Sequence, residues 1–158
     1  MKEKQDNIQA SILDRLIDLE PQLSRESAQY RLLNLSQIKA AVIRDLENLL
    51  NTKSQIMPIP PACRELGDSV FAYGLSDFTS HNSRSPAVRQ ALRQNIEKAI
   101  MRFEPRLRNV TVQIEAPTEE VRSIRLRINA LLVLDPVAEP VTFDTYFDIN
   151  KGEYTIRR

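Results

Sequence analysis

The stretch that decides the fold is SIRLRINALLVLDPVAEPVTFDTYFDI, residues 123–149. In its first part, apolar residues occupy every second position from Ile124, and the run stays mostly apolar as far as Leu134. After a break at residues 135–136, the same alternation returns over residues 141–149. A period of two residues is typical of a strand with one buried face. The stretch therefore predicts two strands.

Shorter strands are predicted on both sides of this pair. Upstream, Val110, Val112 and Ile114 alternate with polar residues. Downstream, residues 150–152 form a turn signal that leads into a last strand at residues 154–156. Consecutive strands joined by short turns pair in antiparallel fashion. The second half of the chain is therefore predicted to be an antiparallel meander.

Two helices are predicted before the strands. Over residues 36–50 most apolar residues recur at steps of three and four, with Ser36 as the predicted N-cap. A second helix starts with a serine and a proline at residues 85–86 and stops before Pro105. The predicted fold class is α+β, with two main helices packed on one face of a small antiparallel sheet formed by the C-terminal half.

The remaining segments set the predicted domain limits. Residues 1–10 are predicted to be a flexible N-terminus, and residues 11–158 a single domain. Residues 66–85 carry two of the three glycines and a polar run, which predicts a mostly irregular connection. One core is expected to hold Leu92, Ile96, Ile100, Val112, Leu126 and Phe143.

Composition excludes several function classes. The 22 basic and 21 acidic residues leave a net charge of +1, so no whole-molecule field attracts nucleic acid or anionic lipid. No apolar run reaches the roughly 20 residues of a membrane span, and the N-terminus has no signal-peptide pattern. The single cysteine, Cys63, cannot form an internal disulfide. We therefore expect a cytoplasmic protein with no direct membrane insertion.

No spacing in the sequence assembles a catalytic or metal-binding site. His81 is the single histidine, and no carboxylate or cysteine pair near it suggests a triad or a zinc site. Cys63 follows Pro60 and Pro61 and is interpreted as a buried or merely tolerated thiol. The scattered glycines form no phosphate-binding loop. We expect no catalytic residue, no metal and no cofactor.

Charge is uneven along the chain. Residues 84–108 contain seven basic and two acidic residues, whereas every charged residue within 129–150 is acidic. These segments are either ordinary solvated surfaces or two oppositely charged docking surfaces. The sequence leaves both interpretations open.

The junction between the second helix and the first strand reads Phe103-Glu104-Pro105-Arg106-Leu107. In one interpretation the apolar pair packs in the core and the charged pair merely flanks the proline that stops the helix. In the other, the proline fixes the backbone so that a carboxylate and a guanidinium project from a rigid corner toward a partner.

Together with three other motifs, this corner resembles the TssE family of type VI secretion baseplate proteins, related to the lysozyme-like wedge protein of contractile phage tails. The other motifs are SILDRL at residues 11–16, DLENLLNTK at 45–53 and YGLSD at 73–77, and all four stand in the family's order. The resemblance covers residues 11–158. It departs at Lys53, where the family more often has arginine, which weakens any bidentate contact there.

The resemblance implies a structural subunit of the baseplate wedge at the inner face of the cytoplasmic membrane. It implies TssF and TssG as wedge partners, the first ring of the TssB and TssC sheath as a contact, and TssK and the hub protein as further neighbours. The family's Glu-Pro-Arg motif, which helps to hold the wedge together, falls on Glu104, Pro105 and Arg106. We expect Arg106→Glu to leave the domain folded and to abolish wedge assembly.

The competing function is a peptidoglycan-cleaving muramidase with Glu104 as the general acid. Glycoside hydrolysis normally needs two carboxyl groups across a sugar-binding cleft. The spacing of Glu97 and Glu115 does not suggest that pairing, and the chain has no tryptophan to stack on a sugar. Nucleic-acid binding has only the basic helix in its favour, without interleaved aromatic residues. We expect neither an enzyme nor a nucleic-acid partner.

The last strand, Tyr154, Thr155, Ile156 and Arg157, is the expected site of sheath contact. An edge strand leaves backbone donors and acceptors unpaired, so an arm of another chain can extend the sheet there. Alternatively, this strand is an ordinary closing hairpin strand. The basic second helix is then the next candidate for the sheath contact.

Overall fold

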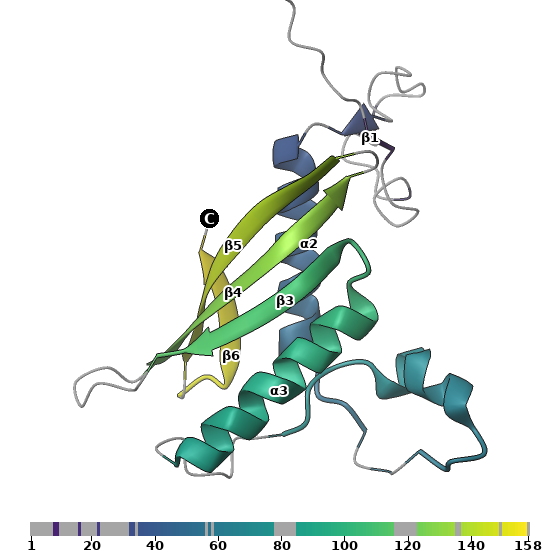
Figure 1. Ribbon diagram of the computed structural model, residues 1–158, viewed down its shortest axis with the longest axis vertical. Helices are drawn as coiled ribbons and strands as arrows, with labels where there is room; N and C mark the ends of the chain where they lie inside the picture. The colour runs from purple at the N-terminus through teal and green to yellow at the C-terminus, as the bar shows by residue number, and fades with distance from the viewer. Residues whose placement is uncertain are drawn as a thin grey trace, which may run out of the picture. The chain divides into compact units, whose positions relative to one another are not determined.

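The protein forms two compact units, Met1–Arg44 and Asp45–Arg158. The computed structural model in Figure 1 describes residues 8–9, 16, 22, 32–33, 35–55, 57, 59–77, 85–115, 123–134, 137–148 and 150–157. The predicted flexible segment 1–10 and the motif at 11–16 lie almost entirely outside these residues, so both stay predictions.

In the first unit, strand β1 (Ile8–Gln9) pairs antiparallel with β2 (Leu32–Leu33). Helix α2 (Leu35–Asn51) begins in this unit and ends in the second. It starts one residue before the predicted cap, so the expectation that Ser36 is the N-cap is wrong. Leucine is a strong helix former, and Leu35 extends the helix by one residue.

Helix α3 (Pro86–Phe103) has the predicted limits. Ser85 occupies the N-cap position with an extended backbone, although its side chain makes no capping hydrogen bond, and Pro86 stands in the first turn. At the other end, the Glu104 amide still donates to the Ile100 carbonyl at 2.9 Å. Pro105 has no N–H to continue this pattern, which ends the helix as predicted.

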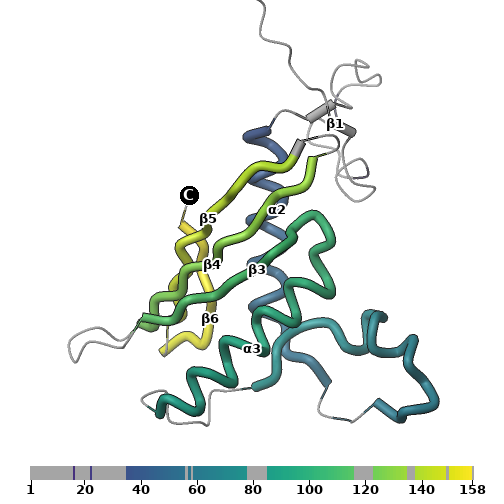
Figure 2. Tube along the Cα trace, viewed as in Figure 1, coloured from purple at the N-terminus to yellow at the C-terminus, as the bar shows by residue number. Residues whose placement is uncertain are grey.

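The second unit contains a four-stranded antiparallel sheet in the order β3-β4-β5-β6 (Figure 1). Figure 2 traces the chain through these strands, each of which runs beside the next. The α+β fold class is therefore confirmed. Their bounds are Leu107–Ile114 for β3, Ser123–Leu134 for β4, Val137–Asp148 for β5 and Glu153–Arg157 for β6.

One face of the sheet is apolar. Along β4 every second side chain is buried, which is the two-residue period expected from the sequence. Pro140 is accommodated inside β5 because β6 pairs only with residues 144–148, so the missing N–H at Pro140 interrupts no ladder on that side. All six residues predicted for the core are buried: Leu92, Ile96, Ile100, Val112, Leu126 and Phe143.

The connection between the helices is more regular than the sequence suggested. Two short 3-10 helices, η2 (Arg64–Asp68) and η3 (Val70–Ala72), occupy part of it, and Ser69 accepts a hydrogen bond from the Phe71 amide. The predicted irregular connection over residues 66–85 is therefore wrong for this part. Single turns of helix are too short to produce a hydrophobic period, which is why the pattern missed them.

Candidate functional site

The corner between α3 and β3 is an internal ion-pair cluster. The guanidinium of Arg106 holds the Glu104 carboxylate in a two-point contact, with Nε donating to Oε1 and Nη2 to Oε2, each at 2.7 Å. The Arg106 amide adds a weaker bond to the same carboxylate at 3.3 Å. Glu104 is only 4% exposed, so this pairing satisfies a buried charge.

A second carboxylate reaches the same guanidinium from α2. Asp45 lies 61 residues earlier in the chain and accepts from Arg106 Nη2 at 2.6 Å. The hydrogen bond to Glu104 and the nearby Asp45 charge both raise the pKa of Arg106 above its ordinary value. Arg106 therefore stays charged and ties the end of α2 to the start of β3.

Tyr73 completes the surroundings of this cluster. Its ring packs edge to face on Phe103, with centroids 5.2 Å apart. Burial raises the pKa of the Tyr73 hydroxyl, and the charges of Asp45 and Glu104 raise it further. The phenol therefore remains neutral beside the two carboxylates.

These contacts correct one expectation. The carboxylate and guanidinium of the corner do not project together toward a partner, because Glu104 is buried and both side chains are paired within the chain. The Arg106 side chain keeps 26% of its surface exposed, and Pro105 is exposed. Whether this remaining surface binds a partner stays a prediction.

Two of the other quoted motifs, at residues 45–53 and 73–77, also meet in space. Leu75 donates its amide to the Thr52 carbonyl at 2.8 Å, and the Lys53 ammonium pairs with Asp77 at 2.9 Å. Gly74 has φ of 110°, and a Cβ there would lie 2.5 Å from the Thr52 carbonyl oxygen, so only glycine fits. Residues 45–53, 73–77 and 104–106 are thus bound to one another, which their separation in sequence did not show.

The outer edge of β6 is closed by two side chains of α2. Asn51 accepts from the Tyr154 amide at 2.7 Å and donates to the Tyr154 carbonyl at 2.9 Å. Glu47 accepts from the Ile156 amide at 2.8 Å. The expectation that this edge leaves its backbone donors unpaired is therefore wrong at these two residues. Helix side chains more than a hundred positions away supply the partners, which a local pattern cannot reveal.

The β3 edge is protected in a different way. Glu97 of α3 accepts from the Val112 amide at 2.9 Å. The register between β3 and β4 shifts between Arg108 and Thr111, and Asn109 has a left-handed backbone with φ of 53°. Such irregularities bend an edge and discourage unwanted pairing.

The polar face of the sheet carries paired charges. Asp144 pairs with Arg127 at 3.1 Å and lies 3.7 Å from Arg125. Arg157 stacks on the Tyr146 ring at 4.4 Å. The acidic surface expected from the sequence is therefore neutralised in part at Asp144, because arginines of the neighbouring strand lie against it.

Other candidate groups add little. Cys63 is exposed, and the described residues contain no group of three or more histidine, cysteine or acidic side chains placed to hold a metal ion. His81 lies outside the described residues. No helix in the described part of the chain has the length and apolar character to span a membrane.

The family model described as "Baseplate wedge protein gp25" matches residues 36–137, and the chain belongs to this family. A chain of the solved structure "The baseplate complex from the type VI secretion system" is similar, with 18% identity and a TM-score of 0.47, over 70% of this chain and 94% of that chain. No curated protein matches significantly.

Proposed function

We propose that this protein is a structural wedge subunit of a type VI secretion baseplate, which joins a TssF and TssG core to the first ring of the TssB and TssC sheath and helps to start sheath assembly. Membership of the baseplate wedge family is the observation that carries this proposal. TssK and the hub protein are further expected neighbours. The expected location is the cytoplasm, at the inner face of the cytoplasmic membrane.

The corner is the proposed contact with the wedge core. Its exposed parts are Pro105 and about a quarter of the Arg106 side chain, which remains charged. Glu104 is buried and fixes the guanidinium through two hydrogen bonds. In this proposal Pro105 and Arg106 touch the partner, whereas Glu104 positions Arg106.

Arg106→Lys tests this contact. Lysine keeps the positive charge but cannot reproduce the planar two-point contact. We expect binding to the TssF and TssG complex to fall by about tenfold, in the range of one lost charged contact at an interface. The measurement is pull-down with purified subunits, with thermal unfolding to show that the variant is folded. The control is Arg108→Lys, an exposed position two residues away. A folded variant with undiminished binding would show that the corner is idle.

The proposed sheath contact remains the last strand, Tyr154, Thr155, Ile156 and Arg157. Because Asn51 and Glu47 already occupy its outer edge, an incoming arm has to displace them. The Asn51 contacts are exposed to water, where exchange of one hydrogen-bond partner for another costs little net free energy. Strand addition is thus proposed as an exchange with α2 side chains.

Removing the Asn51 side chain tests whether an incoming strand replaces it at the β6 edge. Asn51→Ala frees the outward N–H and C=O of Tyr154, and we expect sheath assembly with TssB and TssC to start several times faster. The control is Asn48→Ala, an exposed asparagine on the same helix. Light scattering follows polymer growth. Equal lag times for the wild type and both variants would argue against addition at this edge and would favour α3 as the sheath contact.

We also propose that the protein is not an enzyme. Both oxygens of Glu104 accept hydrogen bonds from Arg106, and Asp45 shares the same guanidinium instead of facing Glu104 across a cleft. This arrangement lacks the two opposed carboxyl groups of a glycosidase. Turnover of purified peptidoglycan that disappears in Glu104→Gln would overturn this proposal.

A further inference from the structure

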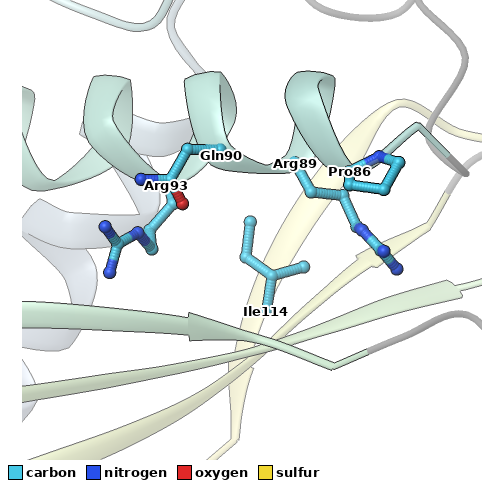
Figure 3. Close-up of a pocket in the computed structure, with 5 residues that line it drawn as sticks. All are labelled: Pro86, Arg89, Gln90, Arg93 and Ile114. Atoms are coloured by element: carbon cyan, nitrogen blue, oxygen red, sulfur yellow. The ribbon is translucent and has the colours of Figure 1, made fainter.

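A hollow of about 280 Å³ lies between the first half of α3 and the end of β3. Its lining consists of Pro86, Arg89, Gln90, Arg93 and Ile114, which we call the α3/β3 groove. Figure 3 shows the Ile114 side chain rising from the strand toward the helix, between the side chains of Arg89 and Arg93. An apolar floor is thus flanked by two guanidinium groups, and the five described lining residues include no carboxylate.

Arg93 forms only a long ion pair with the described residues. Its Nη1 lies 3.9 Å from Glu97 Oε1, which is beyond a direct hydrogen bond. That oxygen instead accepts from the Val112 amide at 2.9 Å, which holds Glu97 to β3. Arg93 Nε is buried, and no group in the described part of the chain pairs with it. A guanidinium has five N–H donors. The Nε donor of Arg93 is buried, so its Nη groups, on a side chain that is 40% exposed, are the donors offered to a ligand.

Arg89 is in a similar position, because its half-buried side chain forms no ion pair with the described residues. Other arginines of the same region differ. Arg102 pairs with Asp68 at 2.7 Å, and Arg106 holds two carboxylates. Arg89 and Arg93, the two arginines of α3 without a close carboxylate among the described residues, are thus the two that line the groove.

We infer that the α3/β3 groove binds an extended acidic segment of a partner protein. A carboxylate of that segment lies between Arg89 and Arg93, and a neighbouring apolar side chain packs on Ile114 and Pro86. Arginine suits this role because its planar donors match a carboxylate in two-point contacts. Gln90 is exposed at the rim and offers an amide to the backbone of the segment.

A protein segment fits the groove better than the other anionic partners. Among the residues that the structure describes, the lining has no aromatic side chain on which a nucleic-acid base can stack. The sequence as a whole carries a net charge of +1, which gives little general attraction to nucleic acid or to an anionic membrane. The apolar floor at Ile114 favours a ligand that joins a carboxylate to an aliphatic side chain.

The test uses the full chain and a synthetic peptide, so it does not depend on the proposed baseplate partners. The octapeptide GSEVEVSG is titrated into the ¹⁵N-labelled protein, with GSQVQVSG as the uncharged control. We expect amide shifts at residues 87–93 and 112–115, and binding of the glutamine peptide at least about tenfold weaker. No shift at millimolar peptide, or equal shifts with both peptides, would overturn the inference.

Matched variants locate the charges. Arg89→Glu with Arg93→Glu is expected to weaken binding of GSEVEVSG by more than about tenfold. Lys98→Glu with Arg108→Glu changes the net charge equally at exposed positions outside the groove and is expected to weaken it less than about threefold through screened long-range attraction. Equal effects of the two double variants would show a diffuse basic surface and no groove site.

Two further measurements close the remaining alternatives. Arg89→Gln with Arg93→Gln removes both charges without adding a repulsion between residue 93 and Glu97, so this double variant is expected to stay folded. Once thermal unfolding shows that it is folded, a loss of binding can be assigned to the missing charges. A single-stranded oligonucleotide is titrated in parallel. If it binds more tightly than GSEVEVSG and shifts the same amides, the groove is a nucleic-acid site and the inference is wrong.

Discussion

The two edges of the four-stranded sheet are closed in different ways. At the β6 edge, Asn51 and Glu47 take three outward backbone groups of Tyr154 and Ile156. At the β3 edge, a bulge and one carboxylate, Glu97, protect the middle of the strand, and the end at Ile114 opens into the α3/β3 groove. An edge position in the sheet order therefore does not by itself make a strand available to a partner.

The difference lies in which side chains the adjacent helix supplies. The end of α2 supplies an amide, which both donates and accepts and so satisfies N–H and C=O together. The start of α3 supplies arginines, which cannot accept from a backbone N–H. At the β6 edge, the Asn51 amide thus satisfies both backbone groups of Tyr154. The end of β3 instead faces Arg89 and Arg93, whose N–H donors can bind a ligand. The corner at Arg106 joins the two sides, because it binds Asp45 of α2 and Glu104 at the end of α3.

Breaking the ion pairs of Arg106 with Asp45 and Glu104 should have the largest effect on stability. Arg106→Glu leaves two carboxylates without their cation and adds a third beside the buried Glu104. We expect a loss of about 3 kcal/mol in the free energy of unfolding, at the lower end for a broken buried pair because the Arg106 side chain is 26% exposed. This is a larger effect on the fold than the sequence suggested. Urea unfolding followed by circular dichroism measures it. Arg108→Glu is the control and should change stability by less than about 0.5 kcal/mol.

The β6 edge should also depend on pH. Burial raises the pKa of Tyr154 from 10.0 to about 12, because the folded state favours the neutral phenol. The corresponding stability is fully present below pH 10 and is lost as the pH rises through 12. A shift of this size corresponds to about 2 to 3 kcal/mol. Absorbance at 295 nm and urea unfolding at several pH values measure it. Tyr154→Phe should remove this part of the alkaline loss, and an unchanged loss would place its source elsewhere.

The two guards of β6 can be separated by hydrogen exchange. Asn51→Ala should speed exchange of the Tyr154 amide and leave that of Ile156 protected, whereas Glu47→Ala should do the reverse. Each change should cost about 1 kcal/mol, as is usual for a single hydrogen-bonding side chain. If both amides lose protection together in either variant, the edge opens as one unit and the separate guards are not independent.

The smallest effect on stability is expected at the open end of β3. Arg93→Gln removes only a long ion pair with Glu97, so the free energy of unfolding should change by less than about 0.5 kcal/mol. Thermal unfolding at low and high salt measures it. A loss above 1 kcal/mol would show that Arg93 holds the fold and is less free for a ligand than its contacts indicate.

The helices and strands could largely be predicted because their signals are local. Pro86 and Pro105 limit α3, and the two-residue period marks β4 and β5, since each pattern depends on backbone geometry within a few residues. The 3-10 turns were missed because they are shorter than any detectable period. The family was also accessible from sequence, since its motifs are short ordered strings.

The candidate site could be predicted only in part. The sequence placed Glu104 and Arg106 at a rigid corner, but their mutual pairing and the approach of Asp45 depend on how α2 lies against the start of β3. An arginine forms an ion pair within the chain only if a carboxylate comes within about 3 Å of its guanidinium. A local sequence pattern does not predict that distance.

The sequence by itself determined the α+β class, the helix limits near the prolines, the alternating burial of the strands and the membership of a baseplate wedge family. Only the tertiary structure decided which edges and charges remain available. Asn51 and Glu47 close β6 from positions 103 and 109 residues away, and Glu97 binds Val112 in preference to Arg93. The physical reason is that periodicity arises from the geometry of neighbouring residues, whereas a hydrogen bond depends on a distance and an angle that chain folding alone brings about.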